Sequence, residues 1–223
     1  MLKTVLTSDN SNTLYVPDLD EYYHSIHGAI QESRHVFINE GLSFLISRGY
    51  KEIDIFEVGF GTGLNALLTW VEAESQNVRV NYYSIEKFPV PVNMALNLNF
   101  SALLALDNND YMEKLHNASW DFLVELSPNF SLKKNKNDLQ CIDVNQHFDL
   151  VYYDAFGPRA QPEMWLPQLL KKSVDLLKDG GIWVSYCAKG QVKRDLKSAG
   201  LQIESIPGPP GKREMTRGCK IVL

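Results

Sequence analysis

The chain has 223 residues, of which 44% are hydrophobic and 22% charged, close to the composition of an ordinary globular domain. This composition excludes an intrinsically disordered chain, and the length favours one domain with a core that needs no disulfide or metal. The three cysteines form no CxxC or Cys/His cluster, so we expect a protein of a reduced, cytoplasmic compartment without a bound metal.

Membrane association is not expected from the sequence. No apolar run approaches the roughly 20 residues that span a bilayer, and the first residues lack the apolar core of a signal peptide. We therefore expect no membrane partner.

The first half of the chain alternates between predicted strands and helices. Residues 1–27 contain several aromatic residues and a proline and are closed by Gly28, which predicts an N-terminal arm or hairpin outside a domain of residues 28–223. In order, the pattern then predicts a helix over 29–48, a strand over 53–58, a glycine-rich turn, a helix to about residue 73 and a strand over 78–86.

The second half continues this alternation until its end. The expected elements are a helix over 101–118, a strand from 130, a buried strand over 148–156, a helix from 162 that ends at Gly180–Gly181, a strand over 181–188, a helix over 189–200, and strands over 201–207 and 218–223. This order predicts an α/β fold with a mainly parallel sheet and an antiparallel C-terminal hairpin.

The segment EVGFGTG (57–63) connects a predicted strand to a predicted helix. Glycines allow a tight turn and the close approach of a ligand, and the helix start offers free N–H groups. Glu86 ends the next strand and can accept both hydroxyls of a ribose. NAD and S-adenosylmethionine both suit this geometry, and the acidic residue that opens the motif favours S-adenosylmethionine. A turn with a purely structural role is the alternative.

Asp154 follows a strongly apolar strand, at the sheet edge where ligands of open α/β sheets bind. It would lie beside the reactive group of the cofactor, with Phe156 and Pro158 as walls of a small planar pocket. The alternative is an aspartate that caps the following loop. Asp138 follows the preceding strand and is interpreted either as a contact to an adenine amino group or as a solvated loop residue.

Three motifs together resemble the methyltransferase domain of the MnmC/MnmD tRNA-modification family. They are EVGFGTGLN (57–65), YYDAFGPRAQPEMW (152–165) and GKREMTRG (211–218), and residues 28–37 are similar to the entry helix of that family. The resemblance extends from about Tyr22 to Gly218. The length resembles the stand-alone MnmD form, which lacks the oxidase half of the bifunctional members.

The resemblance implies a Rossmann-like class I methyltransferase that uses S-adenosylmethionine. Its expected reaction is methylation of the amine of 5-aminomethyl(-2-thio)uridine at the tRNA wobble position. The residues implied at the cofactor are Glu57, Gly59, Gly61, Gly63 and Asn65 at the methionine part, Glu86 at the ribose and Asp138 at the adenine. Those implied at the target base are the catalytic Asp154 together with Phe156, Pro158, Met164 and Trp165.

The C-terminal part of the chain is basic. Residues 189–223 hold eight basic and three acidic side chains, whereas the whole chain has a formal net charge of −5. We expect Lys212 and Arg213 to contact phosphates of the tRNA anticodon arm, with a solvated face and a braced hairpin as the alternative. A small-molecule methyltransferase and a non-catalytic nucleotide-binding module on the same fold stay open as other functions.

Overall fold

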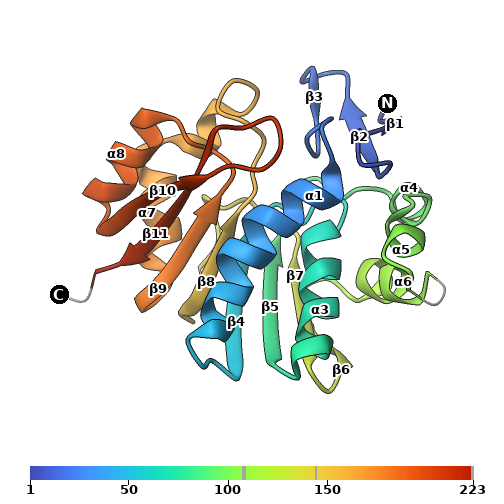
Figure 1. Cartoon of the computed structure of the whole chain (residues 1–223), viewed down its shortest axis with the longest axis horizontal. Coiled ribbons are helices and arrows are strands. Elements are labelled where there is room, and N and C mark those ends of the chain that lie inside the picture. The colour runs from blue at the N-terminus through green and yellow to red at the C-terminus, as the bar shows by residue number, and fades with distance from the viewer. Residues whose placement is uncertain (107–108, 144, 222–223) are drawn as a thin grey trace.

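The structure is a computed structural model that describes residues 1–106, 109–143 and 145–221. Residues 107–108 of the expected helix over 101–118 and residues 222–223 of the last expected strand lie outside this range. An eight-stranded sheet with the order β10-β11-β9-β8-β4-β5-β7-β6 forms the centre of the molecule (Figure 1). Its strands are β4 (Glu52–Val58), β5 (Arg79–Ile85), β6 (Leu123–Ser127), β7 (Phe130–Asn135), β8 (Phe148–Tyr153), β9 (Leu177–Ser185), β10 (Leu201–Pro207) and β11 (Glu214–Lys220).

The pairing of the strands confirms the expected α/β class. Strands β7, β5, β4, β8 and β9 are parallel neighbours, whereas β11 runs antiparallel to both β9 and β10. Parallel neighbours need crossover helices, which explains the alternation of the sequence pattern. The C-terminal hairpin of β10 and β11 is antiparallel, as expected.

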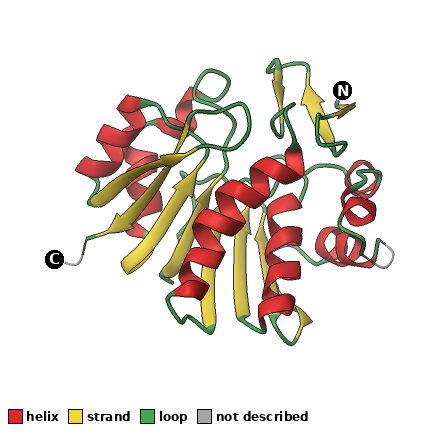
Figure 2. Cartoon of the chain, viewed as in Figure 1, coloured by secondary structure: helices red, strands yellow, loops and turns green. Residues whose placement is uncertain are grey.

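Helices cover both faces of the sheet and enclose two apolar cores (Figure 2). One face carries α1 (Ala29–Ser33), the π-helix η1 (Arg34–Ser43), α2 (Phe44–Ser47) and α3 (Leu64–Gln76), and the other carries α7 (Pro167–Asp175) and α8 (Gly190–Ser198). The short helices are α4 (Val92–Leu96), α5 (Phe100–Leu103), α6 (Asp110–Asn117) and the 3-10 helix η2 (Pro162–Trp165). The helix expected over 29–48 is thus three consecutive helical segments.

The helix that starts near residue 162 ends earlier than the sequence predicts. Helix α7 stops at Asp175, and the expected end at Gly180–Gly181 is wrong because both glycines lie inside β9. There the pairing of β9 with β8 shifts register, and a Cβ at Gly181 would lie 2.8 Å from the Lys178 carbonyl oxygen. The glycines therefore mark a strand irregularity. Strand β6, which pairs antiparallel with β7, was not predicted at all.

The first 22 residues form a second, three-stranded antiparallel sheet. Its strands are β1 (Lys3–Leu6), β2 (Asn12–Val16) and β3 (Glu21–Tyr22). In Figure 1 this sheet lies above the carboxyl ends of β4 and β5, and the buried side chain of Leu14 joins the main core. The N-terminal segment is therefore placed to cover whatever binds at this edge.

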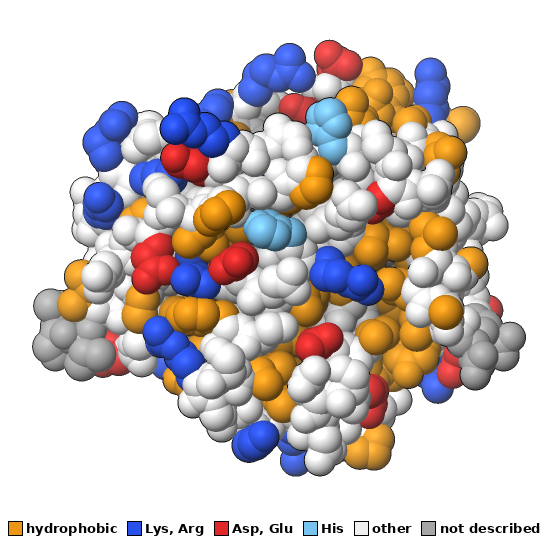
Figure 3. All heavy atoms as spheres, viewed as in Figure 1, with side chains coloured by type: hydrophobic (Ala, Val, Ile, Leu, Met, Phe, Trp, Pro, Cys, Tyr) orange, Lys and Arg blue, Asp and Glu red, His pale blue; other side chains and the backbone are white. Residues whose placement is uncertain are grey.

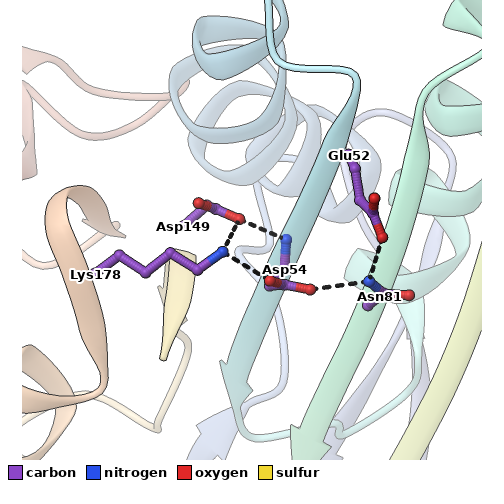
Figure 4. A network of polar contacts seen from close by, with 5 residues as sticks. All are labelled: Glu52, Asp54, Asn81, Asp149 and Lys178. Carbon is purple, nitrogen blue, oxygen red and sulfur yellow. Dashed lines mark hydrogen bonds and ion pairs between the residues drawn. The ribbon is translucent and has the colours of Figure 1, made fainter. Parts of the chain in front are cut away.

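At the amino ends of the strands, an ion-pair network joins four strands (Figure 4). The Nζ of Lys178 lies 2.7 Å from Oδ2 of Asp54 and 2.9 Å from Oδ2 of Asp149. Asp54 also accepts a 2.9 Å hydrogen bond from Nδ2 of Asn81. Because the two aspartates lie on the neighbouring parallel strands β4 and β8, the lysine offsets their repulsion.

Across the described ranges, no helix is both long and apolar enough to cross a bilayer.

Candidate active site

A cavity of about 890 Å³ opens where β4, β5 and β8 end. The strand order changes direction between β4 and β8, because the chain first moves outward to β5 and β7 and then returns to the other side of β4. Ligands of open α/β sheets bind at such a point, and the volume lies within the range of small-molecule sites. The predicted site residues that line the cavity are Gly59, Gly61, Asn65, Glu86, Asp138, Asp154, Phe156, Met164 and Lys212.

The glycine turn borders the cavity with its backbone. Gly59 and Gly61 have φ angles of 92° and 49°. A Cβ at Gly59 would lie 2.9 Å from the Asp154 carbonyl oxygen, and one at Gly61 would lie 3.0 Å from the Tyr23 ring. Gly63 precedes α3, and its neighbour is His116 rather than the cavity. Positions 59 and 61 therefore need glycine, because a Cβ there would meet Asp154 or Tyr23 at the cavity. Gly63 packs against His116, away from the cavity.

Glu86 is fixed at the end of β5 by two backbone groups. Its Oε2 accepts the N–H of Gly61 at 3.0 Å, and its Oε1 accepts the N–H of Phe88 at 2.8 Å. A carboxylate oxygen can accept more than one hydrogen bond, so both oxygens keep acceptor capacity toward the cavity. This geometry suits two adjacent hydroxyls of a ribose.

A buried amide joins two carboxylates at the floor of the cavity. The Nδ2 of Asn65 donates to Oε1 of Glu57 at 3.1 Å and to Oδ2 of Asp154 at 2.8 Å, and Ser84 Oγ donates to Oε2 of Glu57 at 2.6 Å. Burial raises the pKa of Glu57 to about 7. Burial, together with the nearby charge of Glu57, raises the pKa of Asp154 well above its ordinary value.

Glu57 was expected to contact the cofactor directly, but the structure places it beneath the cavity. Its side chain is buried, and it is not among the described residues that line the cavity. It acts on the site through Asn65 and through its charge. The expected contact to a ligand is therefore replaced by a supporting position.

The donor and acceptor set of the cavity fits S-adenosylmethionine. Within the described ranges, the buried Oδ1 of Asn65 has no hydrogen-bond partner, which leaves an acceptor for an N–H donor beside the Asp154 carboxylate. The ammonium group of a methionine moiety is such a donor and carries the complementary charge. The glycine backbone and the Glu86 carboxylate line the same cavity and would suit the nucleoside part.

The side of the cavity expected to hold adenine contains an ion pair. Lys87 Nζ lies 2.8 Å from Oδ2 of Asp138, and Oδ1 of Asp138 accepts the N–H of Gln140. Burial acts to raise the pKa of Asp138, but the bonds from Lys87 and Gln140 outweigh it and the pKa is lowered. Asp138 therefore lines the cavity as an ionised side chain with Lys87 as its partner. The exposed ring of Phe88 lies beside them as a flat apolar surface.

Another part of the cavity wall consists of aromatic and thioether side chains. Phe156 and Met164 line it, and the Tyr23 ring packs edge-to-face on Phe156 with centroids 5.0 Å apart. Trp165 is buried behind this wall and donates from Nε1 to the Phe156 carbonyl oxygen at 2.7 Å. Trp165 and Pro158 are not among the described residues that line the cavity, so Trp165 supports the wall instead of forming it.

Lys212 points into the cavity rather than toward an outer surface. Its Nζ lies 2.5 Å from Oε1 of Glu32 and 3.8 Å from the centroid of the Tyr186 ring. This engagement of the Lys212 ammonium inside the cavity argues against the expected contact with tRNA phosphates. Arg217 is similarly engaged, with Glu40 at 2.8 Å and Glu204 at 2.7 Å.

Arg213 lies outside the cavity and is exposed. Of the residues that the structure describes, none forms an ion pair with Arg213, and Glu214 pairs instead with Lys193 at 2.9 Å. The neighbouring Lys189 and Arg194 are also exposed. Figure 3 shows Lys and Arg side chains along the upper left of this face, over α8 and the C-terminal hairpin.

The lining residues that the sequence analysis missed include Tyr23, Glu32 and Tyr186. Tyr23 belongs to the segment interpreted as an arm, where its aromatic neighbours were the available signal. Glu32 lies in the segment that resembles the entry helix. Tyr186 directly follows β9, at the same sheet edge as Asp154, so its position after a predicted strand was a usable signal.

Comparison with known proteins supports the assignment of the fold. The profile of a family described as "S-adenosyl-L-methionine-dependent methyltransferase" matches residues 122–221. The crystal structure of MnmC2 from Aquifex aeolicus has a TM-score of 0.80 at 26% identity and covers 98% of this chain and 69% of that one. The resemblance to the MnmC/MnmD family is confirmed. The fold of this MnmC-like chain is that of the class I methyltransferases, and the description of the matched family names S-adenosylmethionine as the methyl donor of its members.

The curated relatives are longer proteins. The "tRNA 5-methylaminomethyl-2-thiouridine biosynthesis bifunctional protein MnmC" of Cupriavidus metallidurans is 30% identical over 93% of this chain and 32% of its own length. The protein of the same description from Idiomarina loihiensis is 30% identical over 89% of this chain and 35% of its own length. The chain thus spans about a third of the length of the curated MnmC relatives it matches. The sugar N-methyltransferase KedS8, with a TM-score of 0.53 and 13% identity, shares the fold alone.

Proposed function

We propose that this protein transfers a methyl group from S-adenosylmethionine to the amine of 5-aminomethyl(-2-thio)uridine at the wobble position of tRNA. The observation that carries the proposal is the Asp154 carboxylate, held by Asn65 between the glycine turn and the aromatic wall. The descriptions of the MnmC relatives support the choice of tRNA as substrate. Because the substrate is tRNA, the proposed location is the cytoplasm.

The residues of the chain act mainly by positioning. The cofactor supplies an activated methyl group on a sulfonium, and alignment of the acceptor amine lowers the barrier to in-line transfer. The amine must be neutral when it attacks, so a hydrogen-bond acceptor is needed at its N–H groups. Asp154 orients the amine in this way and receives a proton from it. Asn65 holds the Asp154 carboxylate next to the end of the cavity that takes the cofactor.

The apolar walls suit a planar base. Single-stranded RNA bases are commonly bound by stacking on aromatic side chains after they leave their own stack. Phe156, Met164 and Tyr23 offer such surfaces at the end of the cavity next to Asp154. An anticodon-loop uridine that is turned out of the loop can therefore bring its 5-aminomethyl group to the carboxylate.

We propose that the anticodon arm docks on the exposed basic side chains near the cavity. These are Arg213 on the β10–β11 connection and Lys189, Arg194 and Lys197 on and beside α8. Phosphate contacts of this kind provide sequence-independent affinity. The acidic character of the rest of the chain favours a docking area confined to this region.

Nucleoside mass spectrometry tests the proposal directly. Undermodified tRNA is incubated with the protein and S-adenosylmethionine, and the wobble nucleoside is expected to gain one methyl group. The Asp154→Asn variant serves as the control. Methylation of a small amine but not of tRNA would favour a small-molecule methyltransferase, and cofactor binding without any methyl transfer would favour a binding module.

A further inference from the structure

An ion pair inside the cavity has no part in the function described so far. Glu32 lies on α1 and Lys212 lies on the connection between β10 and β11, 180 residues further along the chain. The Lys212 Nζ is 2.5 Å from Oε1 of Glu32, whose Oε2 accepts the N–H of Ser25 at 2.8 Å. The side chains of Glu32 and Lys212 are 10% and 32% exposed, so this pair is far less screened than a surface pair.

The lysine is connected to the Asp154 segment through Tyr186. Its ammonium lies over the Tyr186 ring, 3.8 Å from the centroid, where the negative face of the ring attracts a cation. The Tyr186 hydroxyl donates at 2.8 Å to the carbonyl oxygen of Ala155, the residue after Asp154. Glu32, Lys212, Tyr186 and Asp154 all line the same cavity.

We propose that Glu32 and Lys212 are positioning residues for Asp154, in which Lys212 supplies the positive charge at the acceptor end and Glu32 holds that charge in place. This inference rests on the proposed function of Asp154 as the group that orients the substrate amine. Lys212 thereby serves the chemistry of the cavity, whereas the basic surface outside it serves tRNA docking.

The charges around Asp154 give the pair a measurable signature. After burial, the charges of Glu57 on β4 and Glu32 on α1 raise the pKa of Asp154, and the charge of Lys212 lowers it. The uncharged groups around the carboxylate are Asn65 on α3, which donates to it, and the tyrosines Tyr186 and Tyr82, whose own pKa values are raised by burial and by the charge of Asp154. Removal of one partner of the ion pair therefore moves the ionisation of Asp154 in a direction set by the sign of the lost charge.

The test compares pH profiles of single-turnover methylation of tRNA. Lys212→Met is expected to move the acid limb to higher pH by about one unit, and Glu32→Gln to move it to lower pH by a similar amount. The double variant loses both charges and is expected to return toward the wild-type midpoint, and Lys212→Arg is expected to keep it. Lys193→Met is the matched control, because it breaks a 2.9 Å lysine–glutamate pair between α8 and β11 that does not line the cavity. Lys212→Gln replaces Lys212→Met if the latter does not fold.

A second readout needs no activity. In the ligand-free protein, each variant is compared with its Asp154→Asn derivative by chemical unfolding across pH. Ionisation of the buried Asp154 destabilises the folded protein as the pH rises to the folded-state pKa of this carboxyl. We expect this loss of stability to end at a higher pH in Lys212→Met and at a lower pH in Glu32→Gln than in the wild type. Shifts in the same direction for both variants, or none, would overturn the inference. A wild type that does not methylate tRNA would instead overturn the proposed function, and the unfolding readout would still test the ion pair.

Discussion

The Nδ2 of Asn65 lies 2.8 Å from Oδ2 of Asp154, and this contact joins two motifs that are 89 residues apart in the chain. One motif is the glycine turn with its helix, and the other is the end of β8. In the proposed function, this single amide fixes the spacing between the cofactor end of the cavity and its acceptor end. In-line methyl transfer depends on this spacing, because a misplaced acceptor loses most of the advantage of a bound complex.

Cofactor affinity should depend on the glycine turn and on Glu86. In Gly61→Val the branched side chain meets the Tyr23 ring and the left-handed backbone disfavours it, and Glu86→Ala removes a ribose acceptor. Loss of a hydrogen bond to a charged group costs about 1.5–3 kcal/mol, so we expect affinity to fall about 10- to 150-fold in Glu86→Ala and strongly in Gly61→Val. Calorimetric titration of S-adenosylmethionine measures both.

The control for Gly61→Val is Gly180→Ala. Gly180 also has a positive φ, of 76°, but open space surrounds its Cβ position and it does not line the cavity. It reports the effect of backbone strain alone. Unchanged cofactor affinity in folded Gly61→Val and Glu86→Ala would place the cofactor elsewhere.

Asp154→Asn should separate chemistry from binding. The amide oxygen of the new side chain can still accept the bond from Asn65, so the fold and much of the cofactor affinity should remain. The amide cannot receive a proton, so single-turnover methylation of tRNA should slow by roughly 10²–10⁴-fold. A variant that keeps the wild-type rate would remove Asp154 from the catalytic role.

Glu57 should make the protein less stable as pH rises. Burial raises its pKa from 4.5 to about 7 in the folded state, so the favourable contribution is fully present below about pH 4.5 and is lost as the pH rises to about 7. The loss is on the order of 3 kcal/mol. Glu57→Gln should flatten this slope in urea unfolding experiments between pH 4.5 and 7.5, and a variant with the wild-type slope would contradict the assignment.

Two arginines of the C-terminal hairpin should behave differently toward tRNA. Arg213 is exposed, so Arg213→Ala should weaken tRNA binding and reduce the salt slope by about one unit if it contacts one phosphate. Arg217 is engaged by Glu40 and Glu204, so Arg217→Ala should lower the melting temperature and leave the slope unchanged. Salt-dependent binding isotherms and thermal melts distinguish the two. The same salt slope in Arg213→Ala and wild type would place the docking surface elsewhere.

Local sequence patterns predicted the parts of the site that follow strands. The glycine turn, Glu86 and Asp154 each come directly after a strand of a parallel sheet, and carboxyl ends of such strands meet at one edge. Position relative to a strand does not tell which way a side chain points. This is why Glu57, on β4 itself, turned out to lie beneath the cavity.

Long-range contacts account for what the sequence did not predict. A lysine in a basic segment is typical of a phosphate contact, so the sequence predicted that role for Lys212. Only the packing of the C-terminal hairpin against α1 brings it to Glu32. The end of α7 was misplaced because a glycine pair more often ends a helix than marks an irregular strand. In each case the deciding interaction joins residues that no local window contains.

The cavity takes its walls from both ends of the chain, from Tyr23 and Glu32 near the start to Lys212 close to the finish. During synthesis, the glycine turn leaves the ribosome well before the hairpin of β10 and β11 exists. At that point the nascent chain contains the glycine turn, but it lacks the residues of the hairpin that complete the acceptor end of the cavity. The acceptor end of the cavity therefore forms only when this hairpin packs on α1 and brings Lys212 to Glu32, so its assembly depends on the folding of segments 180 residues apart.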